Sequence, residues 1–254
     1  MNIGEIRMYS LIIILVMAIL PLPIMVSTAR KSGNAYKAVF EGVLSVGVAL
    51  MMMFMMAAST GNPVGKVLLE NVQTICQMAA ESSQVASMLG MEDASAMERL
   101  TVLTKVYSYA INALPAVIIM CSTVLLYLEY RIMARMTKMA KNPLPMPAPL
   151  SEFTMNRMTV WGWVFIYLMS LGVTLMGFPA GDVLQVNTQL LFQFVFQIQG
   201  VAVIFFYCKM KKLNDIIPVL LCMFFMASAL GQMLLCLLGF LDLGFGLRAR
   251  IKKR

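Results

Sequence analysis

Four long stretches of the sequence contain no Asp, Glu, Lys or Arg, and most of the charged residues lie between them. Each stretch has about the twenty apolar residues with which a helix crosses a hydrocarbon core roughly 30 Å thick. Within a bilayer the backbone must pair its own N–H and C=O groups, so such stretches are predicted to be helices. The four stretches are Val106–Leu128, Met158–Pro179, Val183–Cys208 and Ile216–Leu241. The sequence therefore predicts an all-α, polytopic transmembrane helix bundle.

The composition agrees with a chain that lies mostly in lipid. Hydrophobic residues make up 60% of the 254 residues and charged residues 13%, whereas soluble domains have roughly 45–50% and 25%. The net charge of +8 comes from basic residues spread over several short loops. Loop Lys and Arg residues set orientation and contact anionic headgroups, so we expect the lipid bilayer, and no nucleic acid, as a partner. The expected location is the plasma membrane, as a multi-pass protein.

Two more apolar stretches precede these four, so the predicted number of spans is about six. The first runs from about Tyr9 to Val26, and the second lies near Val39–Ala58. A cleavable signal peptide is the alternative for the first stretch, because Ser27-Thr28-Ala29 has the small residues of a cleavage site. Two prolines, Pro21 and Pro23, interrupt the end of this stretch, which favours a retained span.

An acidic segment, residues 60–100, connects the second span to the third. Its apolar residues recur at the spacing of one helix face, which predicts an amphipathic helix on the membrane surface. These residues are Val64, Leu68, Val72, Ile75 and Met78. No second soluble domain is visible in the sequence, so residues 1–254 are predicted to form a single transmembrane domain.

The distribution of loop charges conflicts with a last span that crosses the membrane once. Basic loops follow the first, third and fifth spans, whereas the acidic segment and the turn at Asp182 follow the second and fourth. The positive-inside rule then puts the basic loops in the cytoplasm, but six crossings would leave the basic tail outside. Either Ile216–Leu247 is broken near residues 227–231 into two short arms that return the tail, or one basic loop violates the rule. We favour the broken span.

Four glutamines in the fifth span recur every four residues and are predicted to form one glutamine stripe. They are Gln185, Gln189, Gln193 and Gln197. Successive members differ by only about 40° around a helix, and Thr188 and Gln199 flank the same side. Since an amide facing lipid loses its hydrogen-bond partners, the stripe is expected to face other helices or a wet cavity. It either bridges helices through hydrogen bonds or lines a candidate ligand-binding site.

Two further residues within or beside the spans are candidates for structural roles. Glu41 lies near the start of the second span, where it either pairs with Lys37 at i−4 or serves a proton or cation site. Pro115 lies within the third span and is expected to kink it. A kink can open space beside a binding site, although most such prolines only shape the packing.

The end of the last span carries one acidic residue, Asp242, after a long apolar run. It is either a solvated interface charge or a cap that pairs with Arg248 or Arg157. A regular helix would separate Asp242 and Arg248 by about 9 Å along its axis, but Gly244 and Gly246 loosen that helix and could let the two side chains approach. An unpaired acid at this depth would be costly, which favours a partner.

No catalytic, metal or cofactor site is predicted. The chain has no histidine, and its five cysteines form no C-x-x-C pair. This removes imidazole metal sites as well as Ser-His and Cys-His catalysis. No nucleophile–base pair and no phosphate-binding glycine loop can be found in the sequence, so we expect that the protein is not an enzyme.

Several short motifs together resemble the YybS family, also called DUF2232, of bacterial membrane proteins. The motifs are Pro21-Leu22-Pro23 with Arg30-Lys31-Ser32-Gly33, then Phe153 with Arg157 and Trp161, then Gln199-Gly200, and the ending Leu238-Gly239-Phe240-Leu241-Asp242 with Phe245 and Arg248. The resemblance covers most of the chain and is best from about Leu114 onward. The family looks distantly similar to the substrate-binding S-components of energy-coupling-factor vitamin transporters. This similarity implies a bacterial inner-membrane protein with an inward-facing small-molecule pocket and a coupling component as partner.

Two hypotheses about function follow. In the first, the protein is transporter-like and binds or transports a small molecule, with the glutamine stripe and nearby polar residues lining the pocket. In the second, it is a non-transporting membrane scaffold whose basic loops and amphipathic segment recruit a protein partner. A pocket that reaches the stripe favours the first hypothesis, whereas amides that are all paired across helices favour the second.

Overall fold

The structure is a computed structural model that describes residues 14–15, 17–59, 64–178 and 181–251. The described residues form helices, turns and extended loops and contain no strand, which confirms the all-α prediction. By its internal contacts the chain divides into two compact units. The N-terminal unit consists of Met1–Ser32 and Lys37–Tyr130, and the C-terminal unit consists of Gly33–Tyr36 and Arg131–Arg254.

Helices α2 (Pro21–Ser32) and α3 (Ala35–Ser59) open the N-terminal unit. Helix α2 begins at a proline, which is tolerated in the first turn because no intrahelical partner is needed there. The second predicted span is confirmed as the apolar part of α3. A methyl group added at Gly42 of α3 would lie 2.7 Å from Met25 Cγ of α2, so a residue without a side chain lets the two helices approach closely. Of the first predicted span, Tyr9–Val26, residues 9–13 and 16 lie outside the described residues, and the end of the span forms the start of α2 at Pro21.

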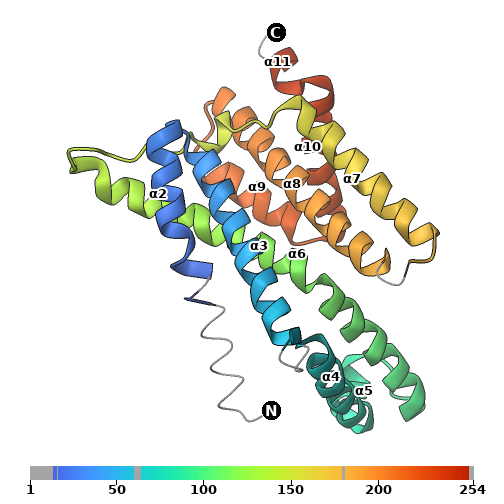
Figure 1. Ribbon diagram of the computed structural model, residues 1–254. Helices are drawn as coiled ribbons and strands as arrows, with labels where there is room; N and C mark the ends of the chain where they lie inside the picture. Colours follow the sequence, from blue (N-terminus) through green and yellow to red (C-terminus); the bar gives the residue numbers. More distant parts are fainter. Residues whose placement is uncertain (1–13, 16, 60–63, 179–180, 252–254) are drawn as a thin grey trace. The chain divides into compact units, whose positions relative to one another are not determined.

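The acidic connecting segment forms two helices, α4 (Val64–Glu81) and α5 (Ser83–Met88), before α6 (Ala96–Met136) begins. Figure 1 shows α4 and α5 beside the first part of α6. Cys76 and Ala80 of α4 form a small core with Leu103 of α6. The predicted helix is therefore present, but its packed face is centred on Cys76 and Ala80, while Ile75 and Met78 are 46% and 63% exposed.

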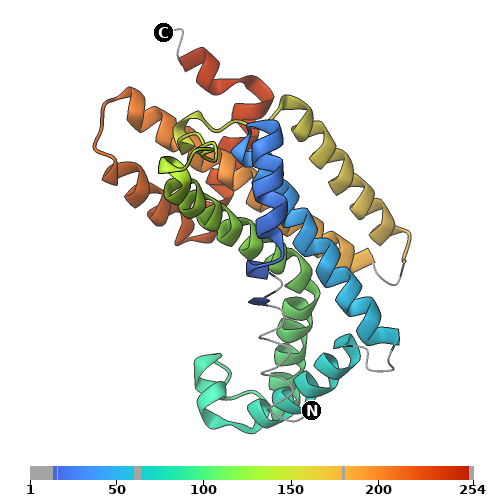
Figure 2. The ribbon, with the colours of Figure 1, turned by 60° about the vertical axis from the view of Figure 1, so that its left-hand side comes forward.

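Helix α6 starts at a capping box and contains the third predicted span. The Ser95 N–H donates to Glu98 Oε2 (2.8 Å), and the Glu98 N–H donates to Ser95 Oγ (3.3 Å), so two otherwise unpaired N–H groups of the first turn are satisfied. The helix has 41 residues and continues through Pro115. Figure 2 shows that α6 is bent along its length rather than interrupted.

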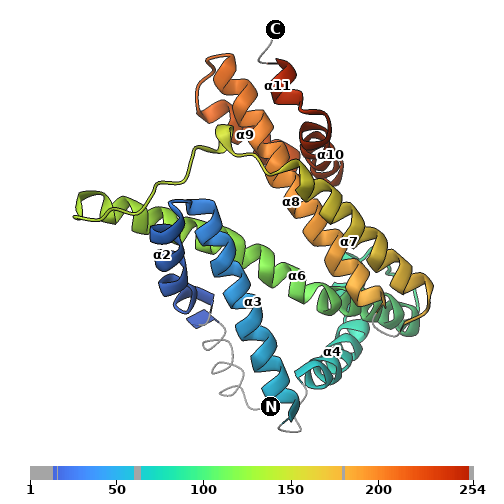
Figure 3. The same cartoon turned by 45° about the horizontal axis from the view of Figure 1, so that its top comes forward.

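The C-terminal unit contains the remaining long helices. Helix α7 (Arg157–Leu175) corresponds to the fourth predicted span and α8 (Gly181–Met210) to the fifth. They lie side by side in Figures 1 and 3. Asn156 caps α7, since its side-chain oxygen accepts from the Met158 N–H at 3.1 Å. Among the described residues, four helices are long and apolar enough to cross a membrane, or up to five if a bent pair counts as one span.

The bent pair is the last predicted span, and the structure confirms that it is broken. Helix α9 (Ile216–Met226) and α10 (Ala229–Phe245) meet at a bend of 118°. Ser228 caps α10 by accepting a hydrogen bond from the Gly231 N–H at 3.1 Å. A methyl group at Gly231 would lie 2.1 Å from the Phe225 carbonyl oxygen, so the sharp bend requires glycine at this place. The short helix α11 (Leu247–Ile251) follows α10.

Helices α8 and α10 cross in direct backbone contact. A methyl group at Gly200 of α8 would lie 2.1 Å from the Leu235 carbonyl oxygen, and one at Gly239 of α10 would lie 1.9 Å from the Phe196 carbonyl oxygen. Small residues at helix crossings allow this approach within membranes, where packing drives association. The crossing places the last turns of α10 against the middle of α8.

Candidate functional site

Asp242 lies in the last turns of α10 and is almost fully buried, with 5% of its surface exposed. Its carboxylate forms an ion pair with Arg248, with 2.7 Å between Arg248 Nη2 and Asp242 Oδ2. Arg248 also donates its Nε–H to Oδ2 at 2.8 Å and its backbone N–H to Oδ1 at 3.1 Å. Of the two partners considered from the sequence, Arg248 is therefore the one that binds Asp242.

The backbone at Gly246 brings these two residues together. Gly246 ends α10 with φ 65° and ψ 48°, and its N–H donates to the Asp242 carbonyl oxygen at 2.8 Å. A residue with a side chain adopts this left-handed conformation rarely, whereas glycine adopts it freely. The turn reverses the chain so that Arg248 reaches the acid six residues before it. Arg157 lies close to this turn, because a methyl group at Gly246 would meet its Nη2 at 2.9 Å.

The Asp242–Arg248 pair is joined to two further segments. Gln199 of α8 is fully buried and donates its Nε2–H to Asp242 Oδ2 at 2.7 Å, while its Oε1 accepts from the Met155 N–H at 3.3 Å. Arg248 Nη1 donates to the Phe153 carbonyl oxygen at 2.7 Å. The guanidinium also lies 6.0 Å from the centre of the Phe206 ring, within the range of a cation–π contact.

The chemistry of this polar cluster, formed by Asp242, Arg248 and Gln199, indicates a structural role. Its carboxylate is neutralised by one guanidinium and accepts hydrogen bonds from two residues, which is how a buried charge is kept in an apolar interior. The cluster ties α8 and α10 to the segment before α7 and to α11. Nearby, Lys209 at the end of α8 pairs with the exposed Glu152 at 2.9 Å.

These contacts show that the end of α8, the start of α7 and the end of α10 lie at the same end of the C-terminal unit (Figures 1 and 3). Basic residues are frequent at this end, which we call the basic end of the unit. Its described basic residues include Arg157, Lys209, Lys211, Lys212, Arg248 and Arg250.

The glutamine stripe is not gathered around one site. Gln189 and Gln193 are exposed, Gln185 and Gln197 are partly buried, and Thr188 and Gln199 are buried. Gln197 donates its Nε2–H to the Gln232 carbonyl oxygen at 3.4 Å, and Gln199 belongs to the polar cluster. Gln189 and Gln193 lie on the surface of the C-terminal unit. The stripe as a whole therefore does not face the interior of that unit. A role of the stripe in ligand binding stays a prediction.

The two remaining candidates lie in the N-terminal unit. Glu41 accepts a hydrogen bond from the Thr28 hydroxyl and lies 3.9 Å from Lys37 Nζ. Both members of the Lys37–Glu41 pair are more than a third exposed, so solvent screens the attraction and it adds little stability. Pro115 lies inside the continuous helix α6.

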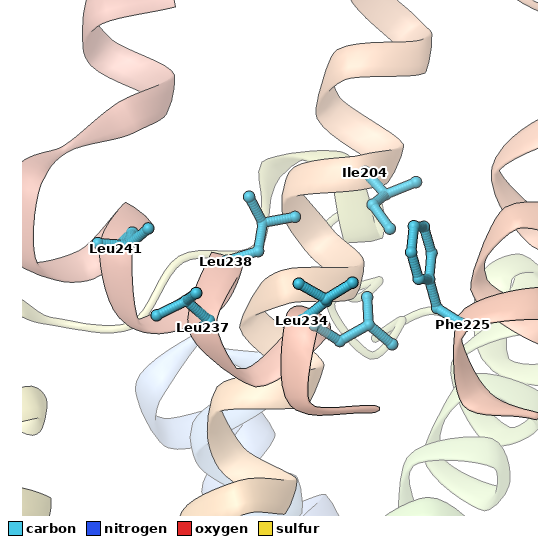
Figure 4. A pocket seen from close by; sticks show the side chains of 7 residues that line it. Ile204, Phe225, Leu234, Leu237, Leu238 and Leu241 are labelled. Atoms are coloured by element: carbon cyan, nitrogen blue, oxygen red, sulfur yellow. The ribbon is translucent and has the colours of Figure 1, made fainter. Parts of the chain in front are cut away.

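A pocket of about 310 Å³ lies in the C-terminal unit, in the angle between α9 and α10 where they meet α8. Figure 4 shows side chains from the three helices around it. They are Ile204 of α8, Phe225 of α9, and Leu234, Leu235, Leu237, Leu238 and Leu241 of α10. All seven are apolar, so this pocket can hold hydrocarbon and offers no side-chain hydrogen bond. It is open on one side, where Leu234 and Leu237 are 53% and 49% exposed.

Sequence reasoning missed this pocket and the glycine crossing of α8 and α10. The leucines of α10 recur at helical spacing, which is a signal of an apolar face, but the same spacing is expected for a helix that faces lipid. Gly239 belongs to the motif Leu238-Gly239-Phe240-Leu241-Asp242, which gave no sign of a helix crossing. Its close contact with Phe196 becomes evident only when the position of α8 is known.

Comparison with known protein families identifies the class of the chain. The family model described as "Predicted membrane protein (DUF2232)" matches residues 6–243, nearly the whole sequence. The chain belongs to the DUF2232 family. The match includes the apolar pocket, the glycine crossing and Asp242. No curated protein and no solved structure matches this DUF2232 chain. Family membership and the apolar helices together make it a membrane protein.

The arrangement of α8–α11 predicts the side of the membrane on which the C-terminal tail lies. Because both ends of the broken span lie at the basic end, the α8–α9 loop and α11 should face the same compartment. We expect Lys211→Cys and Ala249→Cys, each in a cysteine-free DUF2232 background, to be labelled from the same side by a membrane-impermeant maleimide. Asp182→Cys, at the opposite end of α8, is the control and should be labelled from the other side. Labelling of positions 211 and 249 from opposite sides would contradict the arrangement.

Proposed function

We propose that this DUF2232 protein binds an amphiphilic small molecule from the bilayer, with the apolar part of the molecule in the pocket between α8, α9 and α10. The protein would act in the plasma membrane as a binding component, in the manner of the substrate-binding part of a transporter. The observation that carries the proposal is the apolar pocket inside the angle of a broken span.

The chemistry of the lining supports an apolar occupant. A volume of about 310 Å³ is at the lower end of the range of small-molecule pockets, roughly 300–1,000 Å³. Water in a space lined only by Leu, Ile and Phe side chains has no protein side chain to hydrogen-bond, so hydrocarbon replaces it favourably. The bend between α9 and α10 keeps this space open, because two helices that diverge from Ser228 cannot pack against each other along their whole length.

A second candidate function, recruitment of a protein partner, is supported by a different observation. Gln189 and Gln193 are exposed on α8, a helix apolar enough to span the membrane. An exposed amide in hydrocarbon lacks hydrogen-bond partners, and a helix of another protein, such as a coupling component, could provide them. This scaffold function and the binding function are compatible, since the stripe and the pocket use different residues.

Filling the pocket tests the proposed binding function. We expect Leu238→Trp to lower photo-crosslinking of a diazirine-bearing phospholipid to the C-terminal unit by about tenfold, because the larger side chain would occupy the space of the acyl chain. A tenfold loss corresponds to about 1.4 kcal/mol of binding free energy. The crosslinked peptides would be identified by mass spectrometry after purification in detergent.

Leu230→Trp is the matched control. Leu230 lies on the same helix, is 76% exposed and does not line the pocket. This variant should crosslink as the parent does. Equal crosslinking of α10 in the parent and in the Leu238→Trp variant, with both proteins folded by circular dichroism, would overturn the proposal.

A further inference from the structure

Lys212 has a backbone conformation that lysine rarely adopts. It follows α8 with φ 53° and is the only residue other than glycine with positive φ in the described part of the chain. The Lys212 N–H donates to the Lys209 carbonyl oxygen at 3.1 Å, and the Leu213 N–H donates to the Cys208 carbonyl oxygen at 3.0 Å. These two hydrogen bonds form a Schellman motif, in which the residue at the position of Lys212 is usually glycine.

The same chain uses glycine for the corresponding task at the end of α10, where Gly246 has φ 65°. A side chain in the left-handed region brings Cβ close to the following carbonyl oxygen, so lysine at position 212 makes the turn less favourable than glycine would. Residues in sparsely populated backbone regions persist where the surrounding structure holds them, and they cluster at functional sites. The charge of Lys212 is the property that glycine would not supply.

The basic side chains near Lys212 have partners within the chain, whereas no acid neutralises the ammonium group of Lys212 in the part that the structure describes. Lys209 is paired with Glu152, and Arg248 is paired with Asp242. Lys211 lies 5.9 Å from the centre of the Tyr207 ring. Lys212 itself is exposed and forms no ion pair with any residue that the structure describes, and the nearest acid in sequence, Asp215, is also exposed. The loop before α9, with Lys211, Lys212 and Asp215, therefore carries excess positive charge.

The loop and the apolar pocket are separated by a distance that one lipid can bridge. Ile204 lines the pocket, and Lys212 comes eight residues later, in the turn that directly follows the end of α8 at Met210. Eight residues of α-helix extend about 12 Å, less than half of the roughly 30 Å hydrocarbon core. A lipid with an acyl chain in the pocket can therefore have its headgroup beside the loop.

We infer that the amphiphile is an anionic lipid, whose acyl chain fills the pocket and whose headgroup is held by Lys211 and Lys212. This inference rests on the proposed binding function and adds the class of ligand. A zwitterionic lipid would fill the pocket equally well but would leave the excess charge of the loop uncompensated. A basic residue near an anionic headgroup strengthens binding through attraction that salt weakens.

Replacing Lys212 by glycine separates this function from a structural role. The purified protein would be equilibrated with mixed micelles that contain phosphatidylglycerol and phosphatidylcholine, and the retained lipid would be counted by native mass spectrometry. We expect Lys212→Gly to reduce the ratio of retained phosphatidylglycerol to phosphatidylcholine by about fivefold while its melting temperature rises, because glycine relieves the turn. Lys212→Arg should keep the ratio of the parent.

Each alternative has a distinct outcome. An unchanged lipid ratio in Lys212→Gly would overturn the inference and leave the binding function intact. Displacement of phosphatidylglycerol by inorganic phosphate at matched ionic strength would also overturn it, since the loop would then select a soluble anion. Loss of both lipids in Leu238→Trp is the result expected of the binding function, and retention of both would show that this function itself is wrong.

Discussion

Replacing Asp242 by asparagine is expected to lower the free energy of unfolding by about 3–5 kcal/mol, because it leaves the buried Arg248 without its counter-charge. The loss should be large because Arg248 is only 12% exposed and three of its nitrogen atoms donate to Asp242. Gln199 would in addition lose the carboxylate that accepts its hydrogen bond. Thermal unfolding of parent and variant in the same detergent measures the effect.

The control for this variant is removal of residues 252–254, which takes away three basic residues and leaves Asp242, Arg248 and Gln199 in the chain. This truncation should change the melting temperature less than Asp242→Asn does. The double variant Asp242→Leu with Arg248→Leu should recover part of the loss, since replacing both members of a buried pair by apolar residues is often nearly neutral. Equal melting temperatures for the parent and Asp242→Asn would show that Asp242 has no structural role.

Replacing Gly239 by valine is expected to separate α8 from α10 and to destabilise the C-terminal unit by about 3 kcal/mol. Even the first added carbon would lie 1.9 Å from the Phe196 carbonyl oxygen and 2.7 Å from the Gly200 nitrogen. Backbone atoms of a helix cannot rotate away as a side chain can, so the whole helix must shift. A lower melting temperature in detergent, with unchanged helix content by circular dichroism, is the expected result.

Gly244→Val is the matched control on the same helix, since a methyl group at Gly244 would meet nothing within 4 Å. If both valine variants melt at the same temperature, the direct contact between α8 and α10 does not determine the stability of this unit. Such a result would also mean that the pocket lacks one of its walls, because the α8–α10 crossing forms that wall.

Much of the fold could be predicted because the bilayer imposes strong rules on sequence. Helices α7 and α8 follow from stretches without charges, whose length is fixed by the thickness of the hydrocarbon. The break between α9 and α10 could be predicted from a conflict between loop charges and an unbroken span. For Asp242, the sequence left Arg248 and Arg157 as alternative partners. Gly246 was predicted to loosen the end of the helix so that Arg248 could approach, and it does so by ending α10 in a left-handed turn.

The remaining features depend on which surfaces meet, and periodicity does not contain that information. The spacing of Gln189 and Gln193 shows that they share a helix face, but it does not say whether that face meets its own chain, lipid or another protein. The contacts of Gln199 with Met155 and Asp242 join segments 44 and 43 residues apart. Lys212 gave no signal in the sequence, because only its backbone conformation distinguishes it from other loop lysines.

The length of α6 determines where the acidic helices of the N-terminal unit lie. Its 41 residues have a length of about 60 Å along the bent helix axis, twice the thickness of the hydrocarbon. The charge-free part begins at Val106, so we expect the first ten residues, which include Glu98, Arg99 and Lys105, to continue outside the core. Leu100 and Leu103 in this projecting part pack against α4 and α5. We therefore expect the two acidic helices to lie at one surface of the membrane, where soluble proteases and antibodies could reach them from that side.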